Sequence, residues 1–140
     1  SLAGAVGGCQ AQTGSAAAMA SAAIVHALGG TVEQAFAAVA VTLQCMLGLV
    51  CDPVAGLVEV PCIVRNASAA AIAFSSAQIG IAGVDPVIPV DQCVQALGEV
   101  SESMETRYKE TALGGLANTP RARQIEQKVL VQDIKILPDE

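Results

Sequence analysis

Charge is scarce in the first 84 residues of this chain. They hold only four charged residues, and every other charged residue lies from Asp85 onward. Over all 140 residues the charged share is 14% and the hydrophobic share is 53%, whereas soluble domains usually carry roughly 25% charged residues. We therefore expect residues 1–84 to be mostly buried in the protein interior. We also expect an uncovered apolar face, through which the chain associates with itself.

Basic side chains are also few, with seven lysines and arginines against 13 acidic residues and a net charge of −6. Nucleic-acid binding needs a clustered basic surface, so no nucleic-acid partner is expected.

The single histidine, His26, has apolar neighbours and is given no catalytic role. Pyridoxal phosphate chemistry needs a lysine in a pocket, but Lys109, Lys128 and Lys135 all lie in the polar end of the chain. We therefore expect a mechanism that does not use pyridoxal phosphate.

Signals for export and for a membrane are missing as well. No positively charged segment precedes an apolar run at the start, so a signal peptide is not indicated, and the chain reads as part of a longer protein. The uncharged stretch 66–84 approaches the length of a membrane span. An aromatic content of 2% provides no interfacial belt, so we expect a buried helix there and no membrane partner. Five cysteines, an odd number, favour reduced thiols in the cytoplasm over a disulfide framework.

Helix signals are present along most of the chain. The patterns predict helices at about 10–28, 31–48, 63–82 and 91–108, followed by a short one that begins near residue 119. Gly29 and Gly30 end the first, Thr31 and Gln34 form a capping box, Asp91 caps the fourth, and Thr119 caps the last with Pro120 in its first position. Prolines make 49–62 a loop, and the tail 131–140 reads as a strand or as disordered. The sequence therefore predicts an all-α, compact bundle of about five helices with buried Ala-rich helices.

Three cysteines lie beside residues that interrupt helices. Cys9 follows two glycines, Cys51 precedes Asp52 and Pro53, and Cys62 follows Pro61. Thiolates at helix ends are stabilised by backbone N–H groups, and soft thiolates bind zinc, Cu(I) or iron-sulfur clusters. The gaps of 42 and 11 residues match no common zinc or ferredoxin spacing, so buried structural cysteines remain open as an alternative. Cys45 and Cys93 fall within predicted helices and read as small core residues.

The sequence around these three cysteines closely resembles that of bacterial iron-sulfur L-serine dehydratases. The matching region is the C-terminal part of their catalytic α subunit or domain. The likeness is carried by residues 7–15 (GGCQAQTGS) and 48–67 (GLVCDPVAGLVEVPCIVRNA), with 108–111 (YKET) and 114–117 (GGLA) in support. It spans about residues 4–120. The resemblance implies that 1–140 is a C-terminal fragment of the α domain, and that the rest of the α portion and a β subunit or domain are its partners.

The resemblance also implies the chemistry. In that family three cysteines, here Cys9, Cys51 and Cys62, hold three irons of a 4Fe-4S cluster, and the fourth iron stays open for substrate. An open iron acts as a Lewis acid on the serine hydroxyl, and the product yields pyruvate and ammonia. The expected activity is that of an L-serine ammonia-lyase of amino-acid catabolism, which supplies pyruvate to gluconeogenesis. We expect the fragment alone to be inactive.

Four polar residues near the cysteines are candidates for further roles. Arg65 and Asn66 could orient a substrate carboxylate. Arg65 could instead neutralise a cluster or pair with Asp52 or Glu59. Those two carboxylates are candidates for the catalytic base, or for groups that fix the loop.

Some members of the family end in a cysteine near the open iron, whereas this chain continues to Glu140, which favours separate α and β subunits. Two other interpretations stay open. One is a non-catalytic helical interaction module or membrane-embedded module, whose structural sulfurs would be far apart. The other keeps the cluster but uses threonine or another hydroxy acid as substrate.

Overall fold

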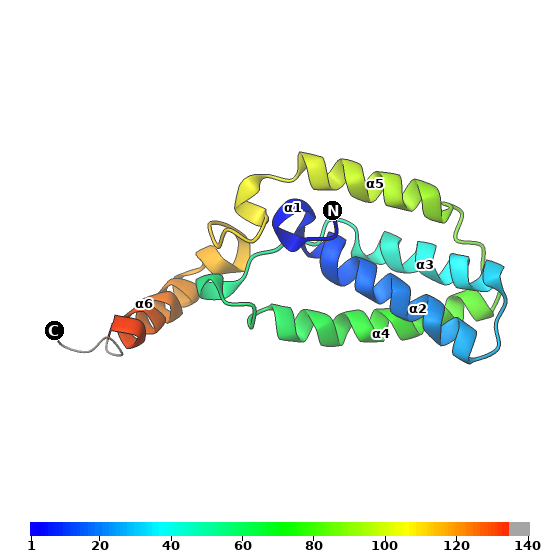
Figure 1. Ribbon diagram of the computed structural model, residues 1–140, viewed down its shortest axis with the longest axis horizontal. Coiled ribbons are helices and arrows are strands. Elements are labelled where there is room, and N and C mark those ends of the chain that lie inside the picture. Colours follow the sequence, from blue (N-terminus) through cyan, green and yellow to red (C-terminus); the bar gives the residue numbers. More distant parts are fainter. Residues whose placement is uncertain (135–140) are drawn as a thin grey trace.

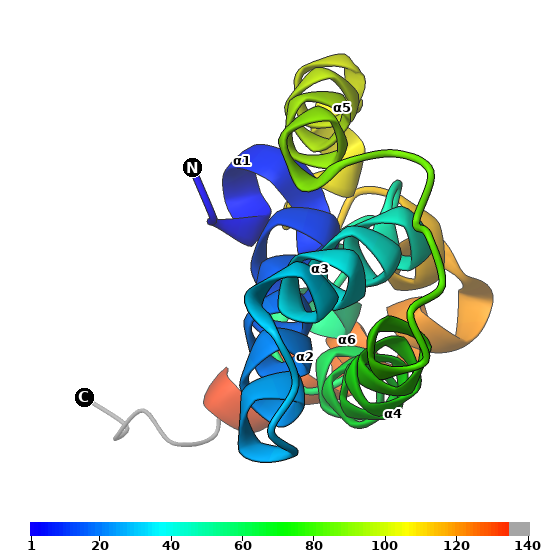
Figure 2. The ribbon, with the colours of Figure 1, turned by 90° about the vertical axis from the view of Figure 1, so that its right-hand side faces the viewer.

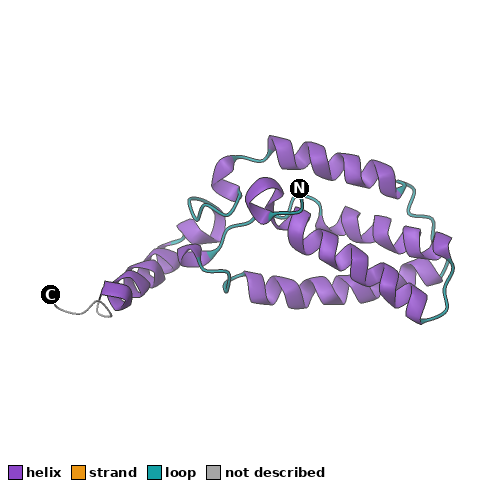
Figure 3. Cartoon of the chain, viewed as in Figure 1, coloured by secondary structure: helices purple, strands orange, loops and turns teal. Residues whose placement is uncertain are grey.

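The computed structural model describes residues 1–134 and contains six α-helices: α1 (Gly4–Cys9), α2 (Ser15–Ala27), α3 (Val32–Met46), α4 (Cys62–Ile81), α5 (Val90–Ser103) and α6 (Pro120–Ile134). A π-helical turn, η1 (Gln10–Gly14), joins α1 to α2, and three 3-10 turns follow: η2 (Val54–Gly56), η3 (Thr106–Tyr108) and η4 (Gly115–Asn118). Five of the α-helices have 13 or more residues, and residues 1–134 contain no β-strand (Figure 3). The predicted all-α bundle is confirmed.

Three helices, α2, α3 and α4, pack against one another along their length (Figures 1 and 2). Their shared core consists largely of buried alanines: Ala17, Ala18, Ala38, Ala40, Ala69, Ala73 and Ala77. A Cβ added at Gly80 on α4 would lie 2.5 Å from the backbone oxygen of Gln34 on α3. Small side chains therefore let these helices approach closely, as the Ala-rich composition predicted.

The remaining helices attach to this three-helix core at different places. Helix α5 packs on α3 and α1, on the side away from α4 (Figure 2). Helix α6 contacts the two 3-10 turns η2 and η4 and projects away from the bundle (Figure 1). The turns η1 to η4 thus gather at one end of the bundle, between its helices and α6.

Helix ends follow the predicted capping signals. Gly29 has a φ of 77°, and the N–H groups of Gly29 and Gly30 donate to His26 and Val25 O, which is the Schellman arrangement. At α3 the capping box between Thr31 and Gln34 is complete, with both hydrogen bonds formed.

At α6 the hydroxyl of Thr119 accepts from the N–H of Ala122 at 3.3 Å, with Pro120 first in the helix. The helix continues to Ile134 and is therefore longer than the short one predicted. The rest of the predicted strand or disordered tail, 135–140, lies outside the described residues.

Other boundaries differ from the sequence expectations. Regular structure begins at Gly4 rather than near residue 10, and Gly8, with a φ of 74°, kinks the chain within α1. Helix α5 ends at Ser103, because Met104 is extended and leads into a segment that pairs with residue 51. Asp91 lies in the first turn of α5, and its N-cap is Pro89.

Helix α4 is not covered all round, since only one stripe of it is buried and Phe74 is 59% exposed. Apolar side chains are exposed at many places in residues 1–84, as the low charge predicted. The densest group lies around the start of α4: Leu57, Val58, Val60, Ile63 and Val64. Self-association through such a face stays a prediction. Among the helices of the described part, none combines the length and the apolar character that a membrane crossing requires.

Candidate active site around three cysteines

Cys9, Cys51 and Cys62 line one cavity of about 250 Å³ at the end of the bundle where the irregular turns gather. The other side chains in its wall are polar or small: Gln12, Thr13, Ala16, Val58, Asn66 and Glu110. The three cysteines come from the end of α1, the loop after α3 and the first turn of α4. The fold therefore brings together the three thiols that the sequence grouped by their surroundings.

Cys9 is fixed by the kink that precedes it. A Cβ at Gly8 would lie 2.8 Å from Leu49 O, so glycine is needed both for its positive φ and for this close approach. The next residue, Gln10, is fully buried, and its N–H donates to Leu49 O at 2.9 Å. Its side chain accepts from Gly48 N and donates to Ser101 Oγ. These bonds join the start of the chain, the loop after α3, and α5.

Cys51 is held by backbone pairing with a distant segment. Its N–H donates to Tyr108 O at 2.8 Å, and its carbonyl accepts from the N–H of Glu110 at 2.9 Å, an isolated parallel bridge to Lys109. Cys51 is 4% exposed. The motif at 108–111 is therefore part of the cavity wall, although it lies more than 50 residues further along the chain.

Cys62 opens α4, where backbone N–H groups at the helix N-terminus favour an anion. The turn before it is closed by the N–H of Val54, which donates to Val60 O at 2.8 Å. One turn into the helix, Arg65 places Nη1 2.6 Å from Asp52 Oδ1, 3.0 Å from Val50 O and 3.9 Å from Cys9 Sγ. Helix α4 thus contributes a thiol to the cavity and places a positive charge near Cys9.

The partner that the structure gives Arg65 is Asp52, one of the alternatives left open by the sequence. Asp52 is buried, and its second oxygen accepts from the N–H of Leu116 at 2.6 Å. Burial works against the charge of Arg65, but the hydrogen bond and the charge of Asp52 prevail and raise the pKa of the guanidinium. Both oxygens of Asp52 are therefore engaged in holding the loop to Arg65 and η4.

Burial and the neighbouring groups make two of the thiols harder to ionise. Burial, and then the proximity of Cys9, raises the pKa of Cys51 to about 12. The pKa of Cys62 is also raised, first by burial and then by Cys9, with Arg65 opposing the shift and Glu110 adding to it. Without a bound cation, Cys51 and Cys62 are therefore protonated at neutral pH, and a metal that binds them must displace protons.

Thiols are donors that suit zinc and iron-sulfur clusters. Within residues 1–134, no three Cys, His, Asp or Glu side chains stand close enough to share one ion. The sulfurs instead surround a cavity, and a cluster offers a separate metal atom to each thiolate. A Cβ at Gly4 would lie 3.2 Å from Cys51 Sγ and 3.1 Å from Gln12 Oε1, so glycine leaves room beside that sulfur.

The remaining predicted site residues fall in different places. Asn66 lines the cavity and accepts a long hydrogen bond of 3.5 Å from Thr13 Oγ1. Glu59 is exposed and is not among the lining residues. The sequence reasoning missed Glu110, because it lies 48 or more positions from each of the three cavity cysteines, although the YKET motif contained it.

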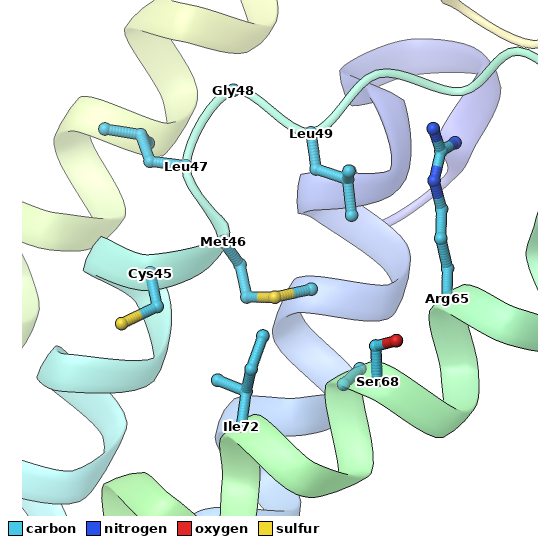
Figure 4. A pocket seen from close by; sticks show the side chains of 9 residues that line it. Cys45, Met46, Leu47, Gly48, Leu49, Arg65, Ser68 and Ile72 are labelled. Carbon is cyan, nitrogen blue, oxygen red and sulfur yellow. The ribbon is translucent and has the colours of Figure 1, made fainter. Parts of the chain in front are cut away.

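Cys45 and Cys93 lie elsewhere, as predicted, but Cys45 is exposed and is not the core residue that the sequence indicated. Cys93 is buried between α3 and α5, where its sulfur approaches Ala40 O. Cys45 lines a second cavity of about 380 Å³ between the end of α3 and α4 (Figure 4). Arg65 and Cys45 lie at opposite ends of that cavity, with Met46, Ser68 and Ile72 between them (Figure 4). Its lining is mainly apolar, so it lacks the donors of the cysteine cavity.

Known proteins resemble this chain over most of its length. The sequence profile of the family described as serine dehydratase alpha chain matches residues 1–117. The probable L-serine dehydratase alpha chain of Bacillus subtilis is 53% identical over 129 residues, which are 92% of this chain and 43% of that protein. The L-serine dehydratase alpha chain of Peptoniphilus asaccharolyticus is 54% identical over 129 residues, again 92% of this chain and 44% of the relative.

L-serine dehydratase 1 of Escherichia coli is 41% identical over 118 residues, covering 84% of this chain and 26% of that protein. The chain thus spans less than half the length of these three relatives. The profile covers all three cysteines and Glu110, and the chain belongs to the serine dehydratase alpha chain family.

Proposed function

We propose that this chain is the part of an iron-sulfur L-serine dehydratase that supplies Cys9, Cys51 and Cys62 as ligands of a 4Fe-4S cluster. The observation that carries the proposal is the shared cavity, since three thiols from distant segments line one space. A non-catalytic module with structural cysteines would have its sulfurs far apart. The family and the names of the relatives support L-serine as the substrate, and the proposed reaction is its conversion to pyruvate and ammonia without pyridoxal phosphate.

The bound cluster would supply a Lewis-acidic iron that makes the serine hydroxyl a better leaving group. The protein's own residues have separate tasks. Arg65, at 3.9 Å from Cys9 Sγ, would offset negative charge on the thiolates. Arg65 was considered either for orienting the substrate carboxylate or for a structural role, and its bond to Asp52 supports the structural role. Asn66 then remains as the cavity residue that would orient the substrate.

Neither carboxylate considered as the catalytic base gains support from its surroundings. Asp52 accepts from Arg65 and from Leu116 N, so both of its oxygens are used. Glu59 is not part of the cavity wall. We propose that the base comes from another part of the enzyme, in line with the α and β partner portions that the relatives' greater length and alpha-chain names support.

The test is anaerobic co-expression of this chain with the complementary α and β portions. We expect a brown protein with the visible absorbance of a 4Fe-4S cluster, and pyruvate formation from L-serine. Air should abolish activity, because an iron without a protein ligand is easily lost. A colourless protein, or full activity after prolonged aeration, would refute the proposal.

Single Cys→Ser variants at 9, 51 and 62 sharpen this test. Each should lose both the cluster absorbance and the pyruvate formation, because a hydroxyl is a poor ligand for iron in such clusters. Cys45→Ser and Cys93→Ser are the matched controls and should keep both. Retained activity in any one of the first three variants would show that the cysteine concerned is not a ligand.

A further inference from the structure

Glu110 is a carboxylate in the cavity wall to which the proposed cluster chemistry assigns no task. Among the described residues that line this cavity, it is the only one with a charged carboxylate beside the three thiols. Its Oε2 lies 3.6 Å from where a Cβ on Gly4 would stand, and that position is 3.2 Å from Cys51 Sγ. The carboxylate therefore reaches the same side of the cavity as Cys51.

The backbone at Glu110 is held in an unusual conformation. Its φ is 67°, a left-handed value that residues with a side chain adopt rarely. The N–H of Glu110 donates to Cys51 O, so the bridge that fixes Cys51 also fixes Glu110. The two residues are therefore presented to the cavity as one unit.

Two properties separate Glu110 from the other acidic groups nearby. Within residues 1–134 it forms no ion pair, whereas Asp52 pairs with Arg65 and Glu105 pairs with Arg107. It is also exposed enough to meet a ligand. Its carboxylate is therefore available to a cationic group that enters the cavity of the three thiols.

We propose that Glu110 binds the α-ammonium group of the substrate and so selects α-amino acids over hydroxy acids that lack an amino group. The inference rests on the proposed function, because it places serine in the cavity of the three thiols. A carboxylate and an ammonium form a charge-assisted hydrogen bond, which is about twice as strong as a neutral one. With Asn66 on the same cavity, the amino and carboxylate ends of an amino acid have separate partners.

The experiment compares two ligands in the complete cluster-loaded enzyme. L-serine carries the ammonium group, and 3-hydroxypropanoate has the same hydroxyl and carboxylate without it. In Glu110→Gln the KM for serine should rise about 10- to 100-fold, the range expected for loss of a bond between charged groups. The inhibition constant of 3-hydroxypropanoate should stay within about twofold. Glu110→Asp, which keeps the charge on a shorter side chain, should recover part of the loss.

Glu105→Gln is the matched control, because Glu105 lies outside the cavity and pairs with exposed Arg107. It should leave both constants unchanged. A parallel rise for both ligands in Glu110→Gln, a fall in kcat with an unchanged KM, or loss of the cluster absorbance in both Glu110 variants would overturn the proposal. The first and third outcomes would indicate a structural role, and the second would indicate proton transfer.

Binding is also measured by equilibrium dialysis with labelled serine, which does not depend on turnover. If the wild type binds serine but forms no pyruvate, the proposed function fails while the role of Glu110 is still decided by the variants. If the wild type binds both ligands equally well, the ammonium is not recognised and the inference about Glu110 fails by itself.

Discussion

The two ends of this molecule are held together in different ways. The three-helix core of α2, α3 and α4 packs through small apolar side chains that recur along each helix. The cavity end depends on single polar contacts between segments far apart in sequence, such as Asp52 with Arg65 and Gln10 with Ser101. Stability in the core is therefore shared among many contacts, whereas at the cavity end a few residues carry most of it.

The largest effect should come from breaking the buried ion pair. Asp52→Asn removes the charge that balances Arg65, whose side chain is only 18% exposed, and loss of one partner of a buried pair costs about 3 kcal/mol. Urea denaturation should show this loss in the free energy of unfolding. Glu126→Gln on α6, which breaks the more exposed pair with Arg123, should cost less than about 1 kcal/mol. Equal losses of unfolding free energy in the two variants would contradict the claim that a few contacts carry most of the stability at the cavity end.

A smaller effect is expected within the helical core. Gly80→Ala places a methyl group 2.5 Å from Gln34 O and 3.1 Å from Ala38 N, so α3 and α4 must separate slightly, at about 1–3 kcal/mol. Gly98→Ala on α5 meets no atom within 4 Å and should stabilise the protein by up to about 1 kcal/mol, because alanine favours helix. Thermal denaturation of both variants measures the difference. If Gly98→Ala were less stable than the wild type, α5 would tolerate an added methyl group less well than the open space around Gly98 indicates.

A further effect concerns protons rather than packing. In the metal-free protein the pKa of Cys51 is raised to about 12 by burial and by Cys9. Alkylation by iodoacetamide needs the thiolate, so its rate at Cys51 should rise about tenfold per pH unit up to pH 10 without a plateau. Because the folded state holds this proton more tightly, the free energy of unfolding should fall as pH rises from about 9 toward 12.

Mass spectrometry of the alkylated peptides would follow each cysteine separately. Exposed Cys45 is the reference and should be labelled first. A plateau in the rate at Cys51 below pH 10 would contradict the raised pKa, and a stability that increases above pH 9 would contradict the sign of the linkage.

Sequence patterns located the helices well where the determinants are local. The capping box at Thr31 and the glycines after α2 depend on residues within one turn, so they could be predicted from the chain alone. The end of α5 could not, because Ser103 is the last helical residue only because the following segment turns to pair with Cys51. Tertiary contacts decide such boundaries, and helix propensity does not contain them.

The same distinction applies to the candidate site. The three cysteines could be grouped because each stands beside glycine or proline, and because the surrounding motifs resemble a known family. Glu110 could not be found in this way, since it enters the cavity through a bridge to a residue 59 positions earlier in the chain. The pairing of Arg65 with Asp52 rather than Glu59 likewise depends on the path of a loop.

The bridge between Cys51 and Lys109 has a consequence for the order of events during synthesis. Cys9, Cys51 and Cys62 leave the ribosome before residues 108–110, and the backbone pairing that fixes Cys51 is complete only when those residues have followed. Until then Gln10 also lacks its partner Ser101. The cavity is therefore finished only after Ser101 and residues 108–110 have been made, and any metal centre held by all three thiols in this geometry forms after that point.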